Sequence, residues 1–505
     1  MMADPGVRPT SQPGARLGFL GSRSMVSIWV GLAAVKLAVH LATSGRYGFH
    51  QDELYYLAAG HHPQLGYVDF PPMTPMLARL GEALFGATPF GLRVLPALAG
   101  AALVLLAGLI ARELGGQRYA QLLAALAALA SPLLLATNWL LQTVTFDQLA
   151  WTVCLLLIIR LLRTGESRLW PLIGLAFGLG LETKYTILAL GAGLFVGLVA
   201  TRQRRLLRSG GVWLAGGIAL LLLLPNLTWQ VSNDWPSWEY IRLHGGQISA
   251  SAGVLAFLVE QIPYAGIIVL PLWVAGWWQL WREPWVRPVA IGVSFTFVAL
   301  MVTGKSYYVG GLYPLLLAAG AVRVEQLLER RATDPRRWQR VIAGIVAVTG
   351  LLVSPLLIPV VPEEVMARSP LVNLRKDFAD SVGWPEVAAQ IAAVAGTTPG
   401  ATILTQTYAE AGAVDLFGGR YGLPSAISGH LTYYFWKPAH VQDSTVIAVG
   451  FSESFLRTLF RDVRPSGTLT NSLGVHNEAF GRPIAVCRDP ITPLDQVWPR
   501  LKNFQ

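Results

Sequence analysis

Long apolar stretches separated by short polar connections occupy most of residues 24–361. A helix crosses a bilayer with about 20 apolar residues, because the hydrocarbon is roughly 30 Å thick and each residue rises about 1.5 Å. The pattern therefore predicts about eleven spanning helices. They cover residues 24–43, 90–111, 119–137, 147–163, 169–183, 185–201, 211–228, 255–281, 288–304, 308–328 and 339–361.

Two of these runs allow a second interpretation. The fifth and sixth abut at Lys184 and would make one long helix, but a lysine at its centre favours a tight reversal into a hairpin. Arg23 before the first run is also typical of a signal peptide. That run is long for a signal peptide and no small-residue cleavage site follows it, so we expect a retained anchor.

The composition agrees with a membrane protein. Of the 505 residues, 53% are hydrophobic and only 13% are charged, whereas soluble proteins carry roughly a quarter charged residues. The net charge of +10 would suit nucleic acid, but the arginines lie in short clusters between apolar runs, which indicates membrane topology instead. Two cysteines, Cys154 and Cys487, provide neither a disulfide framework nor a cysteine metal site.

The arginine clusters also predict an orientation. With the N-terminus inside, the inner connections hold about 20 arginines and the short outer ones about six arginines or lysines, as the positive-inside rule requires. An odd number of spans then leaves the C-terminal part outside.

The texture changes after residue 361, where charges and turn residues appear and apolar runs shorten. Thr402–Leu404, a helix-like Tyr408–Phe417 and Val446–Val449 alternate as strand, helix and strand. We therefore expect an α-helical polytopic membrane domain over 23–361, followed by a small extracytoplasmic α/β domain over 362–505. Residues 1–22 are rich in proline, glycine and serine and are predicted to be a disordered cytoplasmic tail.

The first outer loop, residues 44–89, carries unusual polar residues. Leu54, Leu57 and Ala58 recur with helical spacing, so the preceding Asp52 and Glu53 would open a short helix on the membrane surface. Helix capping alone accounts for an acid at such a position.

Further charged residues fall on the same predicted side. These are Asp69, Asp147, Lys184, Arg242 and Lys305. Capping explains an isolated acid and snorkelling an isolated lysine, but their shared sidedness indicates an outward polar site at the membrane boundary.

Acids and bases collected there suit one chemistry. A carboxylate can accept the proton of a hydroxyl that attacks a sugar carbon, and a lysine can stabilise the charge on a departing phosphate. A divalent metal ion is a weaker possibility, because His50 and Glu53 lie one turn apart and His61-His62 follow, without HExxH-like spacing. Dinucleotide and nucleotide-binding glycine motifs are absent from the sequence.

The order and sidedness of these features resemble the GT-C membrane glycosyltransferases of family 39 type. Within this class the sequence resembles the dolichyl-phosphate-mannose protein mannosyltransferases and the aminoarabinose transferases of lipid A. The resemblance covers about residues 24–361. It is carried by the acidic pair Asp52-Glu53, the acid Asp147, the segment Gly-Leu-Glu-Thr-Lys184-Tyr-Thr and the segment Lys305-Ser-Tyr307-Tyr308.

The resemblance implies an inverting transferase that uses a polyprenyl-phosphate sugar in a bacterial plasma membrane. Residues 23–361 would be the catalytic domain, with Asp52 as general base, Glu53 orienting it or the acceptor, and Asp147 as a second acid. The expected substrate contacts are Lys184, Lys305, Tyr307, Tyr308, Asp69, Arg242 and His50. The tail lacks trefoil-like repeats, so the acceptor stays open between protein, lipid and cell-wall polymer.

Two other functions use the same residues. A transporter or lipid flippase would need a polar path, although such proteins place ionisable residues near the midplane and often carry inverted repeats. A non-catalytic assembly factor would leave the boundary acids and lysines without a role. In the tail, Tyr433–Trp436 fits a domain core or an interfacial belt better than a sugar platform, and Glu410 either caps its helix or approaches the membrane site.

Overall fold

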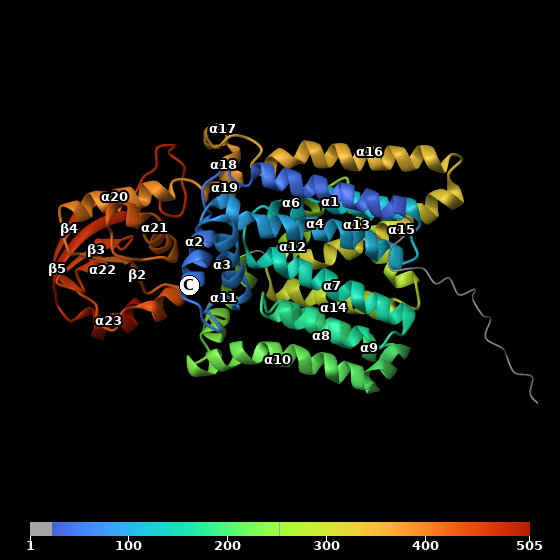
Figure 1. Ribbon diagram of the computed structural model, residues 1–505, viewed down its shortest axis with the longest axis horizontal. Helices are drawn as coiled ribbons and strands as arrows, with labels where there is room; N and C mark the ends of the chain where they lie inside the picture. The colour runs from blue at the N-terminus through green and yellow to red at the C-terminus, as the bar shows by residue number, and fades with distance from the viewer. Residues whose placement is uncertain (1–22, 252, 505) are drawn as a thin grey trace, which may run out of the picture.

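The structure is a computed structural model, and it describes residues 23–251 and 253–504. The tail expected over residues 1–22 lies outside the described residues. Figure 1 shows an elongated molecule with a helical bundle at one end and a lobe built on a β-sheet at the other.

The bundle holds most of the helices, arranged side by side along the long axis (Figure 1). They are α1 (Arg23–Thr43), α4 (Pro89–Glu113), α5 (Arg118–Ala130), α6 (Pro132–Thr137), α7 (Thr143–Thr164), α8 (Leu169–Leu181), α9 (Ile187–Val199), α10 (Gly210–Ser232), α12 (Gly253–Ala265), α13 (Leu270–Arg282), α14 (Arg287–Thr303), α15 (Tyr313–Arg331) and α16 (Pro335–Val353). The 3-10 turns η1 (Arg202–Arg208), η2 (Ser306–Leu312) and η3 (Ser354–Leu356) join or extend them.

Five helical stretches of the described chain are long and apolar enough to cross a membrane, or up to seven if each of two bent pairs counts as one span. Four further apolar helices, in α1, α5, α8 and α14, are shorter. Every predicted run overlaps with helix, although the run 339–361 is helical only as far as Leu356. The protein thus has the helices of a multi-pass membrane protein. The number that crosses the bilayer stays a prediction.

Several predicted runs are interrupted, and the sequence explains where. The run 119–137 breaks into α5 and α6 at Pro132, which has no N–H and cannot continue the α5 ladder. The run 255–281 bends by 110° between α12 and α13, where Gly266 has a φ of 82°. Lys184 lies among the five residues between the end of α8 at Leu181 and the start of α9 at Ile187, so the predicted break between two helices is present.

Close helix contacts in the bundle depend on small residues. A Cβ added at Gly276 of α13 would lie 1.8 Å from the Leu316 carbonyl oxygen, and one at Gly320 of α15 would lie 1.9 Å from that of Leu272. These two helices therefore pack backbone to backbone, which is how membrane helices gain contact without a hydrophobic driving force.

The lobe is built around a five-stranded mixed sheet of order β2-β1-β3-β5-β4. Its strands are β1 (Thr402–Thr405), β2 (Ile427–Ser428), β3 (Thr445–Val449), β4 (Phe460–Thr468) and β5 (Pro483–Pro490). β1 pairs in parallel with β2 and β3, whereas β5 runs antiparallel to β3 and β4. The lobe's helices are α20 (Trp384–Gly396), α21 (Tyr408–Phe417), α22 (Glu453–Leu456) and α23 (Leu494–Leu501). The expected strand, helix and strand are therefore present, while the predicted location of the lobe outside the cell stays a prediction.

Short helices lie between the bundle and the lobe (Figure 1). They are α2 (Gln51–His61), α3 (Met73–Phe85), α11 (Pro236–Ser251), α17 (Glu363–Ala367), α18 (Leu371–Leu374) and α19 (Lys376–Ala379), and the 3-10 turns η4 (Gly418–Tyr421) and η5 (Leu431–Trp436) belong to the lobe. The α2 helix packs on α21, and one apolar cluster contains buried residues of both. Within it the Tyr55 ring stacks on Tyr408 at 4.6 Å and on Tyr433 at 6.1 Å. Tyr433 thus belongs to a core, as the sequence favoured.

Candidate active site

Asp52 is positioned by the way in which α2 begins. His50 precedes the helix in extended conformation, and its Nδ1 accepts a hydrogen bond of 3.1 Å from the Asp52 N–H. Glu53 reaches back and accepts one of 2.9 Å from the His50 N–H. This reciprocal capping satisfies free donors of the first turn and fixes the helix start. The Asp52 carboxylate is left 38% exposed.

Glu53 itself is buried and bound to Arg93 of α4. The Arg93 Nε and Nη2 donate to the two Glu53 carboxylate oxygens at 2.9 and 2.7 Å, and the Leu141 N–H donates to the same carboxylate at 3.1 Å. Arg93 also donates to the carbonyls of Ser44 and Gly48. Glu53 therefore does not line the cavity described next; it holds the helix that carries Asp52.

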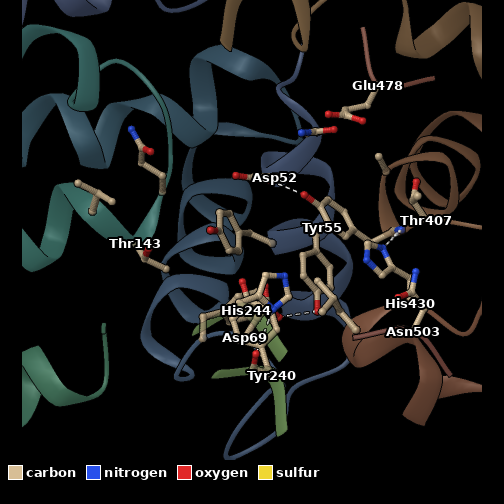
Figure 2. A pocket seen from close by; sticks show the side chains of 18 of the residues that line it. Asp52, Tyr55, Asp69, Thr143, Tyr240, His244, Thr407, His430, Glu478 and Asn503 are labelled. Carbon is tan, nitrogen blue, oxygen red and sulfur yellow. Dashed lines mark hydrogen bonds between the residues drawn. The ribbon is translucent and has the colours of Figure 1, made fainter. Parts of the chain in front are cut away.

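A cavity of about 620 Å³ opens in front of Asp52, at the junction between the bundle and the lobe (Figure 2). The short helices and bundle loops contribute Gln51, Asp52, Tyr55, Tyr56, Asp69, Gln142, Thr143, Lys184, Tyr240, His244, Lys305, Tyr307 and Tyr308. The lobe contributes Gln406, Thr407, Tyr408, His430, Glu478, Arg482 and Asn503. Two distant parts of the chain thus form opposite walls of one mostly polar cavity.

The lobe touches Asp52 through Tyr408. The Tyr408 hydroxyl donates to Asp52 Oδ1 at 2.7 Å, and its ring stacks on His430 at 5.1 Å with 10° between the ring planes. Burial, followed by the charge of Asp52, raises the pKa of Tyr408 well above its usual range. Tyr408 consequently remains protonated and donates to one oxygen of Asp52, which leaves the other oxygen to a substrate.

Asp69 lies on the same cavity and is held by Tyr55. The Tyr55 hydroxyl lies 3.0 Å from Asp69 Oδ1 and 2.8 Å from the Thr432 hydroxyl. Burial raises the pKa of Asp69 to about 7, and the nearby charge of Asp52 acts in the same direction. The cavity therefore holds one carboxyl group that changes its charge near neutral pH.

Lys184 also lines the cavity and lies beside two aromatic rings. Its Nζ lies 3.9 Å from the ring centre of Tyr308 and 5.7 Å from that of Tyr307, so cation–π attraction holds the ammonium group over η2. Lys305, the residue directly before η2, is exposed and lines the same cavity.

Asp147 contacts the turn that carries Lys184. Buried in α7, it accepts hydrogen bonds of 2.8 Å from the Trp151 indole N–H and of 2.8 Å from the Thr186 hydroxyl. Thr186 belongs to the turn that carries Lys184, so Asp147 fixes that turn and does not line the cavity.

The structure thus separates the ten predicted site residues into two groups. Asp52, Asp69, Lys184, Lys305, Tyr307 and Tyr308 line the cavity, whereas His50, Glu53, Asp147 and Arg242 do not. His50, Glu53 and Asp147 hold elements that carry the first group, and Arg242 is exposed on α11.

The sequence did not identify the residues of the lobe as part of the site. Tyr408 is the first residue of α21, which follows β1 after a two-residue turn. Glu410 caps α21 by accepting a hydrogen bond of 3.0 Å from the Thr407 N–H. The segment Tyr408-Ala-Glu410 was the available signal for this turn, but nothing in it points to Asp52.

The described residues contain no group of three or more His, Cys, Asp or Glu side chains that could hold a metal ion. His61 pairs with Glu82 at 2.8 Å, and His62 stacks on Trp436 at 4.6 Å. The two histidines therefore have partners of their own, and His50 and Glu53 cap α2.

Comparison with known proteins supplies the class of fold. A family model described as dolichyl-phosphate-mannose-protein mannosyltransferase matches residues 69–229. Among solved structures, ArnT from Cupriavidus metallidurans is similar at 18% identity and a TM-score of 0.58, over 92% of this chain and 98% of ArnT, both in the apo state and bound to undecaprenyl phosphate. No curated protein sequence matches significantly.

A second solved structure, also of a glycosyltransferase, is less similar. Arabinofuranosyltransferase AftD from Mycobacteria is similar at 16% identity and a TM-score of 0.50, over 93% of this chain and 42% of AftD. The chain therefore shares the GT-C fold of these structures, and it has the apolar helices of a multi-pass membrane protein.

Proposed function

We propose that this protein is a glycosyltransferase that moves a sugar from a polyprenyl-phosphate donor to an acceptor hydroxyl, with inversion, in the cavity at Asp52. One observation carries the proposal. A half-exposed carboxylate and two lysines line the same cavity at the end of an apolar helix bundle. The likeness to ArnT, a structure of which is bound to undecaprenyl phosphate, agrees with a lipid-linked donor.

In the proposed reaction, the free oxygen of Asp52 accepts the proton of the acceptor hydroxyl. That hydroxyl oxygen forms a bond to the anomeric carbon of the sugar from the side opposite the phosphate. The bond between the anomeric carbon and the phosphate oxygen breaks, and its electron pair stays on the phosphate. The single displacement inverts the anomeric carbon.

Lys184 and Lys305 are proposed to receive the phosphate. An ammonium group stabilises the negative charge that develops on the leaving oxygen more than it stabilises the intact phosphodiester, and this difference accelerates the reaction. Tyr307 and Tyr308 keep the Lys184 ammonium in place. The distribution of arginines favours the outer face of the membrane as the place of the reaction, and the likeness to a bacterial ArnT agrees with a bacterial plasma membrane.

The proposal is tested with the full-length protein in liposomes, given membrane lipid extract as donor and envelope material from host cells lacking the gene as acceptor. Substitution Asp52→Asn keeps the shape of the side chain but removes its basicity. We expect sugar transfer to fall by about 100- to 10,000-fold, which is the usual contribution of a general base. Mass spectrometry of the glycans and lipids measures the product.

Asp234→Asn is the matched control, because Asp234 is an exposed acid between α10 and α11 that does not line the cavity. It should transfer at the wild-type rate. Wild-type transfer by Asp52→Asn would remove Asp52 as the base. Uptake of a solute into the liposomes without any covalent product would favour the transporter instead.

A further inference from the structure

A second cavity adjoins the candidate active site. It measures about 640 Å³ and lies between α11 and the lobe. Gln406 and Asn503 line both cavities, so the two lie next to each other at these side chains. Single ligand sites commonly measure about 300–1,000 Å³, so each of the two is large enough for a ligand unit of its own.

The wall formed by the lobe carries aromatic rings. Phe451 and Phe455 stack with their ring centres 5.7 Å apart and 14° between the ring planes. Phe455 belongs to α22 and is only partly buried. Sugar rings present an apolar C–H face and a rim of hydroxyl groups. An aromatic surface beside amide side chains such as Gln406 and Asn503 matches both features.

The cations of this cavity already have partners. Lys502 Nζ lies 2.6 Å from a carboxylate oxygen of Glu239, which joins the lobe to α11, and Arg500 donates to the Thr458 hydroxyl at 3.2 Å. A phosphate group that bound Lys502 would have to displace Glu239, and with it the contact between the lobe and α11. A neutral ligand that offers hydroxyl groups can bind with both contacts intact.

We infer that the acceptor is a neutral glycan chain of several units, whose reacting end lies at Asp52 and whose next units lie in the second cavity on Phe455. This inference rests on the proposed function and adds the chemical class of the acceptor to it. Successive units of the chain would then lie from Asp52, past Gln406 and Asn503, toward α11.

The test measures binding and needs no donor. Full-length Asp52→Asn protein in lipid nanodiscs is titrated with fluorescently labelled neutral glycans, which are released from the envelope of host cells lacking the gene and sorted by length. We expect affinity to rise by about tenfold from single units to chains of about four, which corresponds to about 1.4 kcal/mol. Adding Phe455→Leu should abolish the gain while single units bind as before.

Tyr421→Leu is the matched control, because Tyr421 is a 51% exposed aromatic residue of the lobe outside both cavities. It should leave the length dependence unchanged. Unimpaired binding of single units by Phe455→Leu also verifies that this variant is folded.

Affinity independent of glycan length, or stronger binding of phosphorylated glycans or of peptides, would overturn the inference. The two proposals fail separately. If binding does not depend on glycan length but Asp52→Asn loses transfer, only the inference about the second cavity is rejected. If Asp52→Asn transfers sugar undiminished, the catalytic role of Asp52 is rejected, whatever the binding result.

Discussion

At the scale of single residues, the two oxygens of Asp52 have different surroundings. Oδ1 accepts from a tyrosine that comes from the lobe, while Oδ2 lies 3.9 Å from His50 Nδ1, which already accepts the Asp52 N–H. A carboxylate with one oxygen occupied and one available has a defined direction for proton transfer, and orientation of this kind is a large part of what an active site contributes.

Asp69 leads to a prediction about pH. Its pKa is raised by burial from the usual 3.8 to about 7, so the folded protein binds this proton more tightly than the unfolded chain does. The resulting stabilisation is complete below about pH 4 and is lost as the pH rises toward and through 7. Asp69→Asn stays neutral at every pH, so its unfolding temperature relative to wild type should be higher at pH 8 than at pH 5.

The measurement is thermal unfolding in detergent between pH 4 and pH 8. Asp380 and Glu363, whose pKa values burial raises to about 6 and about 7, titrate in the same window. They are present in both proteins and cancel in the difference. A constant difference between Asp69→Asn and wild type across this range would contradict the assignment.

At the scale of elements, the start of α2 depends on one buried ion pair. Glu53→Gln leaves the Arg93 guanidinium in the interior without a counter-charge, and breaking a buried pair on one side typically costs about 3–5 kcal/mol. Because Glu53 also caps the turn that presents Asp52, transfer activity should fall together with the unfolding temperature.

Glu82→Gln on α3 is the matched control. Glu82 pairs with Arg79 and His61 at the surface, where such pairs contribute about 0–1 kcal/mol. The unfolding temperature should therefore fall clearly in Glu53→Gln and stay close to that of the wild type in Glu82→Gln. Equal behaviour of Glu53→Gln and Glu82→Gln would mean that the buried pair does not hold α2.

Elements were predictable from the sequence where a local signal decides them. Apolar length located the helices, and the spacing of Leu54, Leu57 and Ala58 located α2 with Asp52 at its start. The roles of Glu53 and Asp147 were not predictable, because their partners Arg93 and Thr186 are 40 and 39 residues away. Nor was Tyr408, which is 356 residues from Asp52, since periodicity reports only on the element that carries it.

At the scale of the whole molecule, the cavity exists only while the lobe is docked on α2. Gly412 of α21 lies close to α2, because a Cβ there would lie 2.9 Å from the Leu54 Cβ and 3.2 Å from the Leu54 carbonyl oxygen. Gly412→Val should push α21 away from α2, lower the unfolding temperature and reduce transfer, since Tyr408 would move away from Asp52.

Gly396→Val provides the comparison, because a Cβ at Gly396 at the end of α20 meets nothing within 4 Å. Activity and thermal unfolding of this variant should stay close to wild type. If Gly412→Val transfers sugar as fast as Gly396→Val does, transfer does not require the contact between the lobe and α2.

The cavity joins side chains from Gln51 to Asn503, and this has a consequence for biosynthesis. A nascent polypeptide inserts its early helices into the bilayer long before β5 and α23 emerge from the ribosome. During that interval the carboxylate at position 52 has no docked lobe to supply the hydrogen bond of its tyrosine partner. On the proposed function, the protein therefore becomes able to transfer sugar only after its helices are already in the membrane.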